Sequence, residues 1–133
     1  MPILIDTNIA IYVRDDEPSI MARLASLAAP PQLSVVTRVE LEGGSAGISS
    51  VAKRRRARLD ELLESLEVHD FDSTCAAVYR TVIECCGYSR SRVLDRMIAA
   101  TAIVHDLSLI TINGDDFRDI PGLKLEIWPA PPQ

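Results

Sequence analysis

The chain has 133 residues, a length that suits one domain able to bury about two-thirds of its unfolded surface. Fourteen basic against nineteen acidic residues give a net charge of −5, which argues against a general attraction of the whole surface to nucleic acid. No apolar stretch approaches the roughly 18 residues of a membrane span, and the N-terminus lacks a signal-peptide pattern. We therefore expect a cytoplasmic protein with no membrane association.

Short apolar runs alternate with helical patterns along the whole chain. Strands are predicted at 3–5, 33–36, 68–71, 109–112 and 123–127, and helices at about 8–14, 18–29, 37–44, 52–67, 73–86 and 93–105. This alternation predicts an α/β fold in which a short parallel sheet of about four to five strands is flanked by helices. No repeat or linker divides the chain, so residues 1–133 are expected to form a single domain.

The first charged residue, Asp6, follows directly after the apolar run Ile3-Leu4-Ile5. A run that does not alternate with polar residues is typical of a strand covered on both faces, and the carboxyl ends of such strands open into the ligand crevice of α/β proteins. Asp6 would then lie at the mouth of a site. The alternative is that Asp6 caps the following helix, a role that Asn8 could also serve.

A second acid, Glu40, lies in the sequence SVVTRVELEGG, residues 34–44. We predict a strand that passes into a helix with Thr37 as its N-cap, and Glu40 three residues later completes a capping box. The capping box explains Glu40 if it is taken alone. The same placement also puts an acid just beyond the end of a strand.

A third acid, Asp95, lies near the start of a helix that is apolar nearly all round, within residues 92–107. Its spacing from Ile98, Ala99 and Ala102 places all four on one helix face, so the carboxylate should point toward the interior. A buried acid must be paired or bound to a metal. A favourable interaction with the helix N-terminus would explain the position of Asp95 but not its inward direction.

The predicted strand 109–112 runs into a turn that holds Asn113, Asp115 and Asp116. Turns favour these residue types in any protein. Together with the acids above, however, they would form an oxygen-only cluster on one side of the sheet, which suits Mg²⁺ or Mn²⁺. Such a site supports displacement at phosphorus, so a phosphodiester backbone is the expected substrate. The histidines, His69 and His105, lack ligand spacing and are not expected to act.

One run of basic residues interrupts this acidic chain. In residues 52–67, five cations precede four acids, and the leucines follow the spacing of an amphipathic helix. Cations near the N-terminus and anions near the C-terminus oppose the helix dipole, so local helix stability does not explain their order. The run is either a solvated face or a phosphate-binding surface that would use Arg54, Arg55 and Arg58.

The succession LIDTN, SVVTRVEL, LDRMIAATAIVHDL and LITINGDDF…IPGL…IW resembles the PIN-domain ribonucleases, specifically the VapC-type toxins of bacterial VapBC toxin–antitoxin pairs, over nearly the whole chain. The resemblance implies a three-layer α/β/α fold with an acidic quartet at the active site. The matching positions are Asp6, Glu40, Asp95 and Asp116, with Mg²⁺ or Mn²⁺ on Asp6, Asp95 and Asp116, and with Thr111 and Asn113 in support. Asp115 competes with Asp116, which is favoured because its neighbour Phe117 matches the family's acid–Phe pair.

The resemblance also implies an activity and its partners. Members of such families are metal-dependent endoribonucleases, commonly homodimeric, and a VapB-type antitoxin silences them by filling the toxin's groove in a hetero-oligomer. We therefore expect a type II toxin that hydrolyses RNA. A different class of function stays open from the sequence, namely a binding module that keeps the fold and acts only by sequestering a protein partner or RNA.

Overall fold

The structure, a computed structural model, describes residues 2–132 and contains two groups of parallel strands, one of three strands and one of two. Its strands are β1 (Ile3–Ile5), β2 (Leu33–Ser34), β3 (Val68–His69), β4 (Ser108–Thr111) and β5 (Lys124–Ile127). β4 pairs with β1 and β5, β2 pairs with β3, and every pair is parallel. An isolated parallel bridge between Leu4 and Gln32 joins the two groups, so the order across the molecule is β3-β2-β1-β4-β5.

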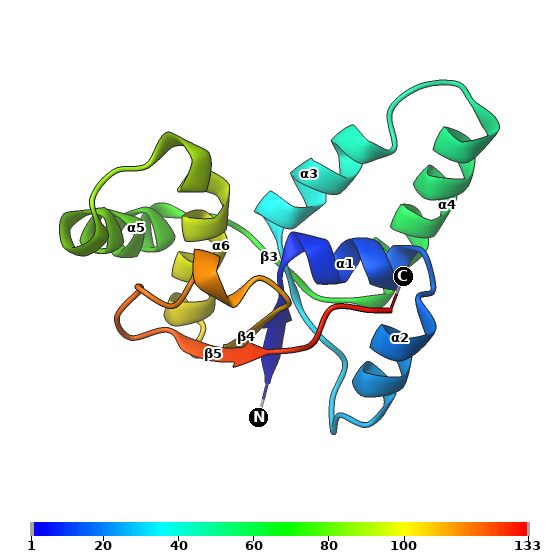
Figure 1. Ribbon diagram of the computed structural model, residues 1–133. Coiled ribbons are helices and arrows are strands. Elements are labelled where there is room, and N and C mark those ends of the chain that lie inside the picture. Colours follow the sequence, from blue (N-terminus) through cyan, green and yellow to red (C-terminus); the bar gives the residue numbers. More distant parts are fainter. Residues whose placement is uncertain (1, 133) are drawn as a thin grey trace.

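Helices cover this sheet on both sides (Figure 1). They are α1 (Thr7–Arg14), α2 (Pro18–Ala25), α3 (Val35–Gly44), α4 (Ser50–Ser65), α5 (Ser73–Cys86) and α6 (Val93–Val104), with short 3-10 helices η1 (Arg90–Arg92) and η2 (Gly114–Asp116). α1, α2 and α4 pack on one face and α5 and α6 on the other. The three-layer α/β/α architecture expected from the sequence is therefore confirmed.

The central strands are buried on both faces because successive side chains point to opposite sides of a strand. Ile3 and Ile5 of β1 and Ile110 of β4 belong to the core beneath α1, α2 and α4. Leu4 and Leu109, which alternate with them, belong to the core beneath α5 and α6. This explains why the apolar runs in the sequence contain no polar alternation, and it directs the carboxyl ends of both strands toward one edge.

The predicted boundary between β2 and α3 was wrong. The strand ends at Ser34 rather than at Val36, and the helix begins at Val35. Ser34 is the N-cap, because its Oγ accepts a hydrogen bond from the backbone N of Val36 at 3.0 Å. Thr37 therefore lies inside the helix and does not form a capping box with Glu40.

Two other helix ends also differ from their predicted positions. α2 ends at Ala25, before the predicted end at 29, because Ser26 caps it and donates a hydrogen bond to the Arg23 carbonyl. α4 begins at Ser50 because Ser49 accepts a hydrogen bond from Ala52 N. Within residues 2–132, no helix has both the length and the apolar character needed to cross a bilayer.

Candidate active site

Asp6 lies at the carboxyl end of the central strand β1 and is only 3% exposed. Its Oδ1 accepts a hydrogen bond from Ile9 N at 3.0 Å, so it is the N-cap of α1, one of the two roles expected for it. Its Oδ2 accepts a hydrogen bond from Thr111 Oγ1 at 2.5 Å. Because both oxygens are held, the Asp6 carboxylate has one fixed orientation.

Glu40 reaches the same region from the second turn of α3 rather than from just beyond a strand, because α3 starts earlier than predicted. Its Oε1 accepts a hydrogen bond from Thr7 Oγ1 at 2.6 Å. Thr7 also shares a hydrogen bond of 3.0 Å with the buried Thr37 hydroxyl. Thr7, at the start of α1, therefore holds the Glu40 carboxylate near Asp6.

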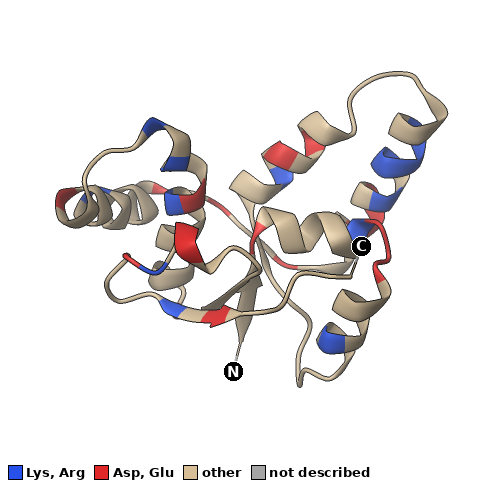
Figure 2. Ribbon diagram, viewed as in Figure 1, with Lys and Arg blue, Asp and Glu red and all other residues tan. Residues whose placement is uncertain are grey.

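Asp95, in the first turn of α6, is partly buried. Burial, together with the negative charges of Asp116, Asp6 and Glu40, raises the pKa of its carboxyl from 3.8 to about 6, while Arg92 acts in the opposite direction. The four predicted acids are thus close enough to repel one another. Figure 2 shows their segments, on α3, α6, η2 and the β1–α1 junction, around the carboxyl end of β1.

The pKa of Asp6 is also raised. Burial is the largest cause, and the nearby charges of Glu40 and Asp116 add to it. The hydrogen bonds from Thr111 and Ile9 oppose this rise because they stabilise the ionised carboxylate. The two donors therefore favour the ionised form of Asp6 in its buried position.

The two adjacent aspartates of η2 have different surroundings. Asp116 is partly buried and is one of the charges that act on Asp6 and on Asp95. Asp115 is exposed and forms an ion pair with Arg118. The structure thus brings Asp116, and not Asp115, into the cluster of acids.

Thr111 and Asn113 lie where β4 leads into η2. Besides donating to Asp6, the Thr111 hydroxyl accepts a hydrogen bond from Asn113 N at 2.9 Å. This bond fixes the turn that carries Asp116. The Asn113 side chain is partly buried and forms no hydrogen bond within residues 2–132.

The donor set fits a hard divalent cation in its chemistry. All four side chains offer carboxylate oxygens, the ligands that Mg²⁺ and Mn²⁺ prefer, and their mutual repulsion is what a bound cation would relieve. Across residues 2–132, no three His, Cys, Asp or Glu side chains converge as closely as metal ligands do. A cation bound here would therefore have to draw the carboxylates closer together.

The arginines of α4 do not join this cluster. Arg54, Arg55 and Arg58 lie beside the C-terminal end of α1, whereas Asp6 precedes its N-terminal end. Figure 2 shows the basic segment of α4 apart from the acidic segments of α6 and η2.

Two features of the structure were not predicted from the sequence. Thr7, the hydroxyl residue directly after Asp6, holds Glu40, and only its place in the first turn of α1 hinted at this. His69 and His105 stack with ring centroids 4.0 Å apart, and His69 also bonds to Gln32. Burial lowers the pKa of His69, and the neighbouring His105 lowers it further.

Residues 3–123 match the PIN domain family. The chain therefore belongs to the PIN-domain family. It is 31% identical over 130 residues to Ribonuclease VapC2 of Rickettsia felis, with 94% of this chain and 96% of the relative covered. It is 30% identical over 129 residues to the tRNA(fMet)-specific endonuclease VapC of Shigella flexneri, with the same coverage of both chains. The resemblance inferred from the sequence motifs is thus confirmed, and within the family the similarity is to VapC proteins.

Solved structures of other proteins are also similar to this chain over most of its length. The VapBC2 complex of Rickettsia felis, bound to a DNA fragment from its promoter, contains a chain that is 31% identical, with a TM-score of 0.81 and coverage of 96% of this chain and 99% of that chain. FitAcB from Neisseria gonorrhoeae gives 28% identity, a TM-score of 0.70 and coverage of 92% and 95%. The whole domain, and not only the sheet, is therefore shared with these proteins.

Proposed function

We propose that this protein is a Mg²⁺- or Mn²⁺-dependent endoribonuclease that acts as the toxin of a type II toxin–antitoxin pair. The observation that carries the proposal is the group of four mutually repelling carboxylates at the carboxyl end of β1, where Thr111 and Ile9 fix the buried Asp6. The relatives support it, because their names specify a ribonuclease and a tRNA endonuclease.

Each acid has a distinct part in this proposal. Asp6, Asp95 and Asp116 would hold the cation. When bound, the cation supplies Lewis-acid chemistry, which activates the attacking water and offsets the charge that develops at the scissile phosphate. Glu40, held by Thr7, orients the attacking water by accepting a hydrogen bond from it.

Thr111 serves as a positioning residue in this scheme. Its hydrogen bond favours the ionised form of Asp6, which is the form that binds a cation. Asn113 supports the same turn through its backbone. Asp115, which is paired with Arg118, has no part in holding the cation.

We further propose a VapB-type antitoxin as the protein partner, bound to a homodimer of this chain in a hetero-oligomer. The similar chains of Rickettsia felis and Haemophilus influenzae were solved as VapBC assemblies. On this chain, Ile48 is 92% exposed, Val39 65% and Val51 47%, on and between α3 and α4. Exposed apolar side chains of this size offer surface that a partner protein could cover.

The test is cleavage of RNA by the purified chain with Mg²⁺, with Mn²⁺ and with EDTA. A tRNA should be among the substrates, because one relative's name specifies tRNA(fMet). We expect cleavage with either metal, none in EDTA, and none for Asp6→Asn under any condition. Cleavage that survives EDTA, or that Asp6→Asn retains, would point to a contaminating nuclease or to a different site and would overturn the proposal.

A further inference from the structure

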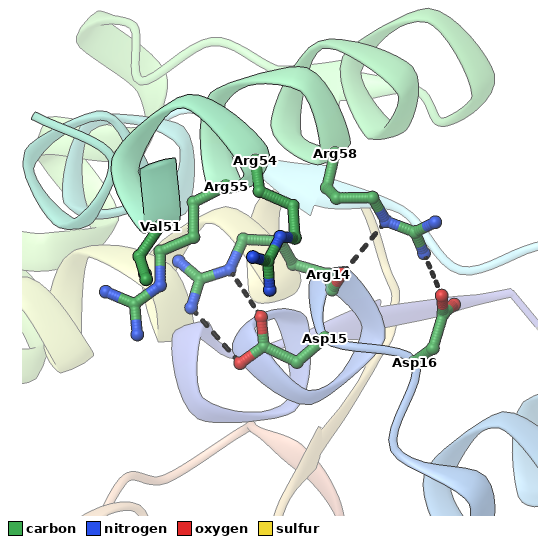
Figure 3. A pocket seen from close by; sticks show the side chains of 7 residues that line it. All are labelled: Arg14, Asp15, Asp16, Val51, Arg54, Arg55 and Arg58. Atoms are coloured by element: carbon green, nitrogen blue, oxygen red, sulfur yellow. Dashed lines mark hydrogen bonds and ion pairs between the residues drawn. The ribbon is translucent and has the colours of Figure 1, made fainter. Parts of the chain in front are cut away.

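A second site candidate lies between α1 and α4, away from the acidic cluster. It is a cavity of about 360 Å³ that none of the four acids lines. Figure 3 shows the side chains around it, which come from the end of α1, the turn after it and α4: Arg14, Asp15, Asp16, Val51, Arg54, Arg55 and Arg58.

We call this cavity, with its seven lining residues, the arginine pocket. Two of its arginines are held in place by contacts within the fold. Arg14, the last residue of α1, is only 4% exposed, and its Nε donates to Asp15 Oδ1 at 3.0 Å. Arg58 donates to the Arg14 carbonyl at 3.1 Å and pairs with Asp16 at 2.5 Å. The C-terminal end of α1 thus accounts for Arg58, because cations are favourable beside the last carbonyls of a helix.

The other two arginines are not accounted for by the fold. Arg54 makes no hydrogen bond or ion pair with any residue in 2–132, and its guanidinium lies between the Arg14 and Arg58 pairs in Figure 3. Arg55 makes one long hydrogen bond, of 3.4 Å, to the Gly44 carbonyl. Both side chains are exposed. They oppose the dipole of their own helix and have no internal acid to compensate them.

The charges around the arginine pocket favour an anion. Four guanidinium groups face two carboxylates, and each carboxylate already has its own arginine, Asp15 with Arg14 and Asp16 with Arg58. The excess positive charge therefore lies on Arg54 and Arg55. Guanidinium groups donate in a planar fork that matches the oxygens of phosphate, so the chemistry of the pocket is that of a phosphate site.

The position of the arginine pocket relates it to the acids. α1 has eight residues, so its rise of about 1.5 Å per residue separates the pocket from Asp6 by about 12 Å. A polyanion that enters the acidic cluster is repelled by the four carboxylates and by a chain of net charge −5. A cationic contact one helix length away from the acids would offset this repulsion and hold the polyanion in place.

We propose that the arginine pocket binds a backbone phosphate of an RNA strand whose scissile bond lies at the acidic cluster. The proposal rests on the function proposed above and adds a second contact for the substrate. Arg54 and Arg55 supply the contact, while Arg14 and Arg58 hold the pocket in shape.

The test is the affinity for a single-stranded RNA oligonucleotide in EDTA, where no cleavage is expected, over a series of salt concentrations. The variant is Arg54→Gln/Arg55→Gln. Lys53→Gln combined with Arg80→Gln is the matched control, because it removes the same charge from exposed residues that do not line the pocket. We expect the pocket variant to bind several-fold more weakly and to lower the salt slope by about two, and the control to change either quantity far less.

Three results would overturn the proposal: unchanged binding by the pocket variant, an equal loss in the control, or no binding of RNA by the wild type. Unchanged RNA binding together with lost affinity for an acidic protein partner would assign the pocket to that partner instead. Because binding is measured in EDTA, its outcome is separate from that of the cleavage assay. If the chain binds RNA through Arg54 and Arg55 but does not cleave it, the proposed role of the pocket would stand and the proposed ribonuclease activity would be wrong.

Discussion

The hydroxyl of Thr111 donates a hydrogen bond to Asp6 across a sequence separation of 105 residues, and both side chains are buried. Thr111 is the last residue of β4 and Asp6 directly follows β1, its parallel neighbour, so the register of the sheet brings the two together. The bond lowers the pKa of Asp6 against the rise that burial causes. A single hydroxyl thus supports the charge on the most buried of the four acids.

We predict that Thr111→Val destabilises the protein and weakens catalysis. The substitution leaves an Asp6 oxygen and the Asn113 N–H without their partner, and each such loss costs about 1–3 kcal/mol. It should also raise the pKa of Asp6 further, so that activity requires a higher pH. Melting curves and a pH–activity profile measure the two effects.

Thr101→Val is the matched control for Thr111→Val. Thr101 is equally buried, but its hydroxyl donates to the Met97 carbonyl within α6 and does not contact the acids. Its replacement should leave the pH profile unchanged, and Thr111→Ser should restore most of the activity. A Thr111→Val protein with the wild-type pH profile would show that the hydroxyl has only a structural role.

Much of the fold could be predicted because its elements are read from local patterns. β1 and β4 are short apolar runs, and α5 and α6 begin within a residue of their predicted starts. The apolar stretch at 33–36 was different, since its valines favour a strand locally. There the Ser34 hydroxyl bonds to Val36 N, and Val36 packs into the core with α6, so the helix prevails.

The contacts between residues of the site were harder to predict from the sequence than the identity of those residues. The direction of Asp95 follows from helical spacing, but the bond between Thr7 and Glu40 requires α1 and α3 to lie side by side. The difference between Asp115 and Asp116 depends on the direction that η2 gives each of them. The arginine pocket likewise depends on the turn after α1, whose position relative to α4 no local pattern reveals.

We predict that Mg²⁺ or Mn²⁺ raises the melting temperature of the wild type above its value in EDTA. A ligand that binds only the folded form stabilises it, by about 2.7 kcal/mol when its concentration is one hundred times its dissociation constant. Asp116→Asn should respond much less, because it removes one of the acids that interact with Asp6 and Asp95. Asp115→Asn should respond as the wild type does. Equal responses from both variants would contradict the assignment of Asp116.

Expression of the chain without a partner should arrest the growth of a bacterial host, and Asp6→Asn should relieve the arrest. An RNA-cleaving enzyme made inside the cell attacks the host's own RNA unless something restrains it. Growth curves with immunoblots for protein level measure the effect. Normal growth while wild-type protein accumulates to the level of Asp6→Asn would contradict the toxin proposal.

Asp95→Asn should abolish cleavage and yet stabilise the metal-free protein at neutral pH. Burial and the charges of Asp116, Asp6 and Glu40 raise the pKa of Asp95 from 3.8 to about 6, so its ionisation is penalised in the folded state. Asparagine keeps the shape of the side chain and removes the charge. In EDTA at about pH 7.5 we expect its melting temperature to exceed that of the wild type by about a few degrees.

The stabilisation by Asp95→Asn should depend on pH. Below about pH 4 Asp95 is protonated in the folded state, so the wild type has no penalty there. The penalty grows as the pH rises from 3.8 to about 6, because the unfolded chain ionises first, and it is constant above that range. The advantage of Asp95→Asn should therefore vanish on acidification, while Asp60→Asn, at an exposed position on α4, should gain nothing at any pH. An Asp95→Asn protein that melts well below the wild type in EDTA would make this carboxylate a structural partner, and it would remove Asp95 from the proposed metal site.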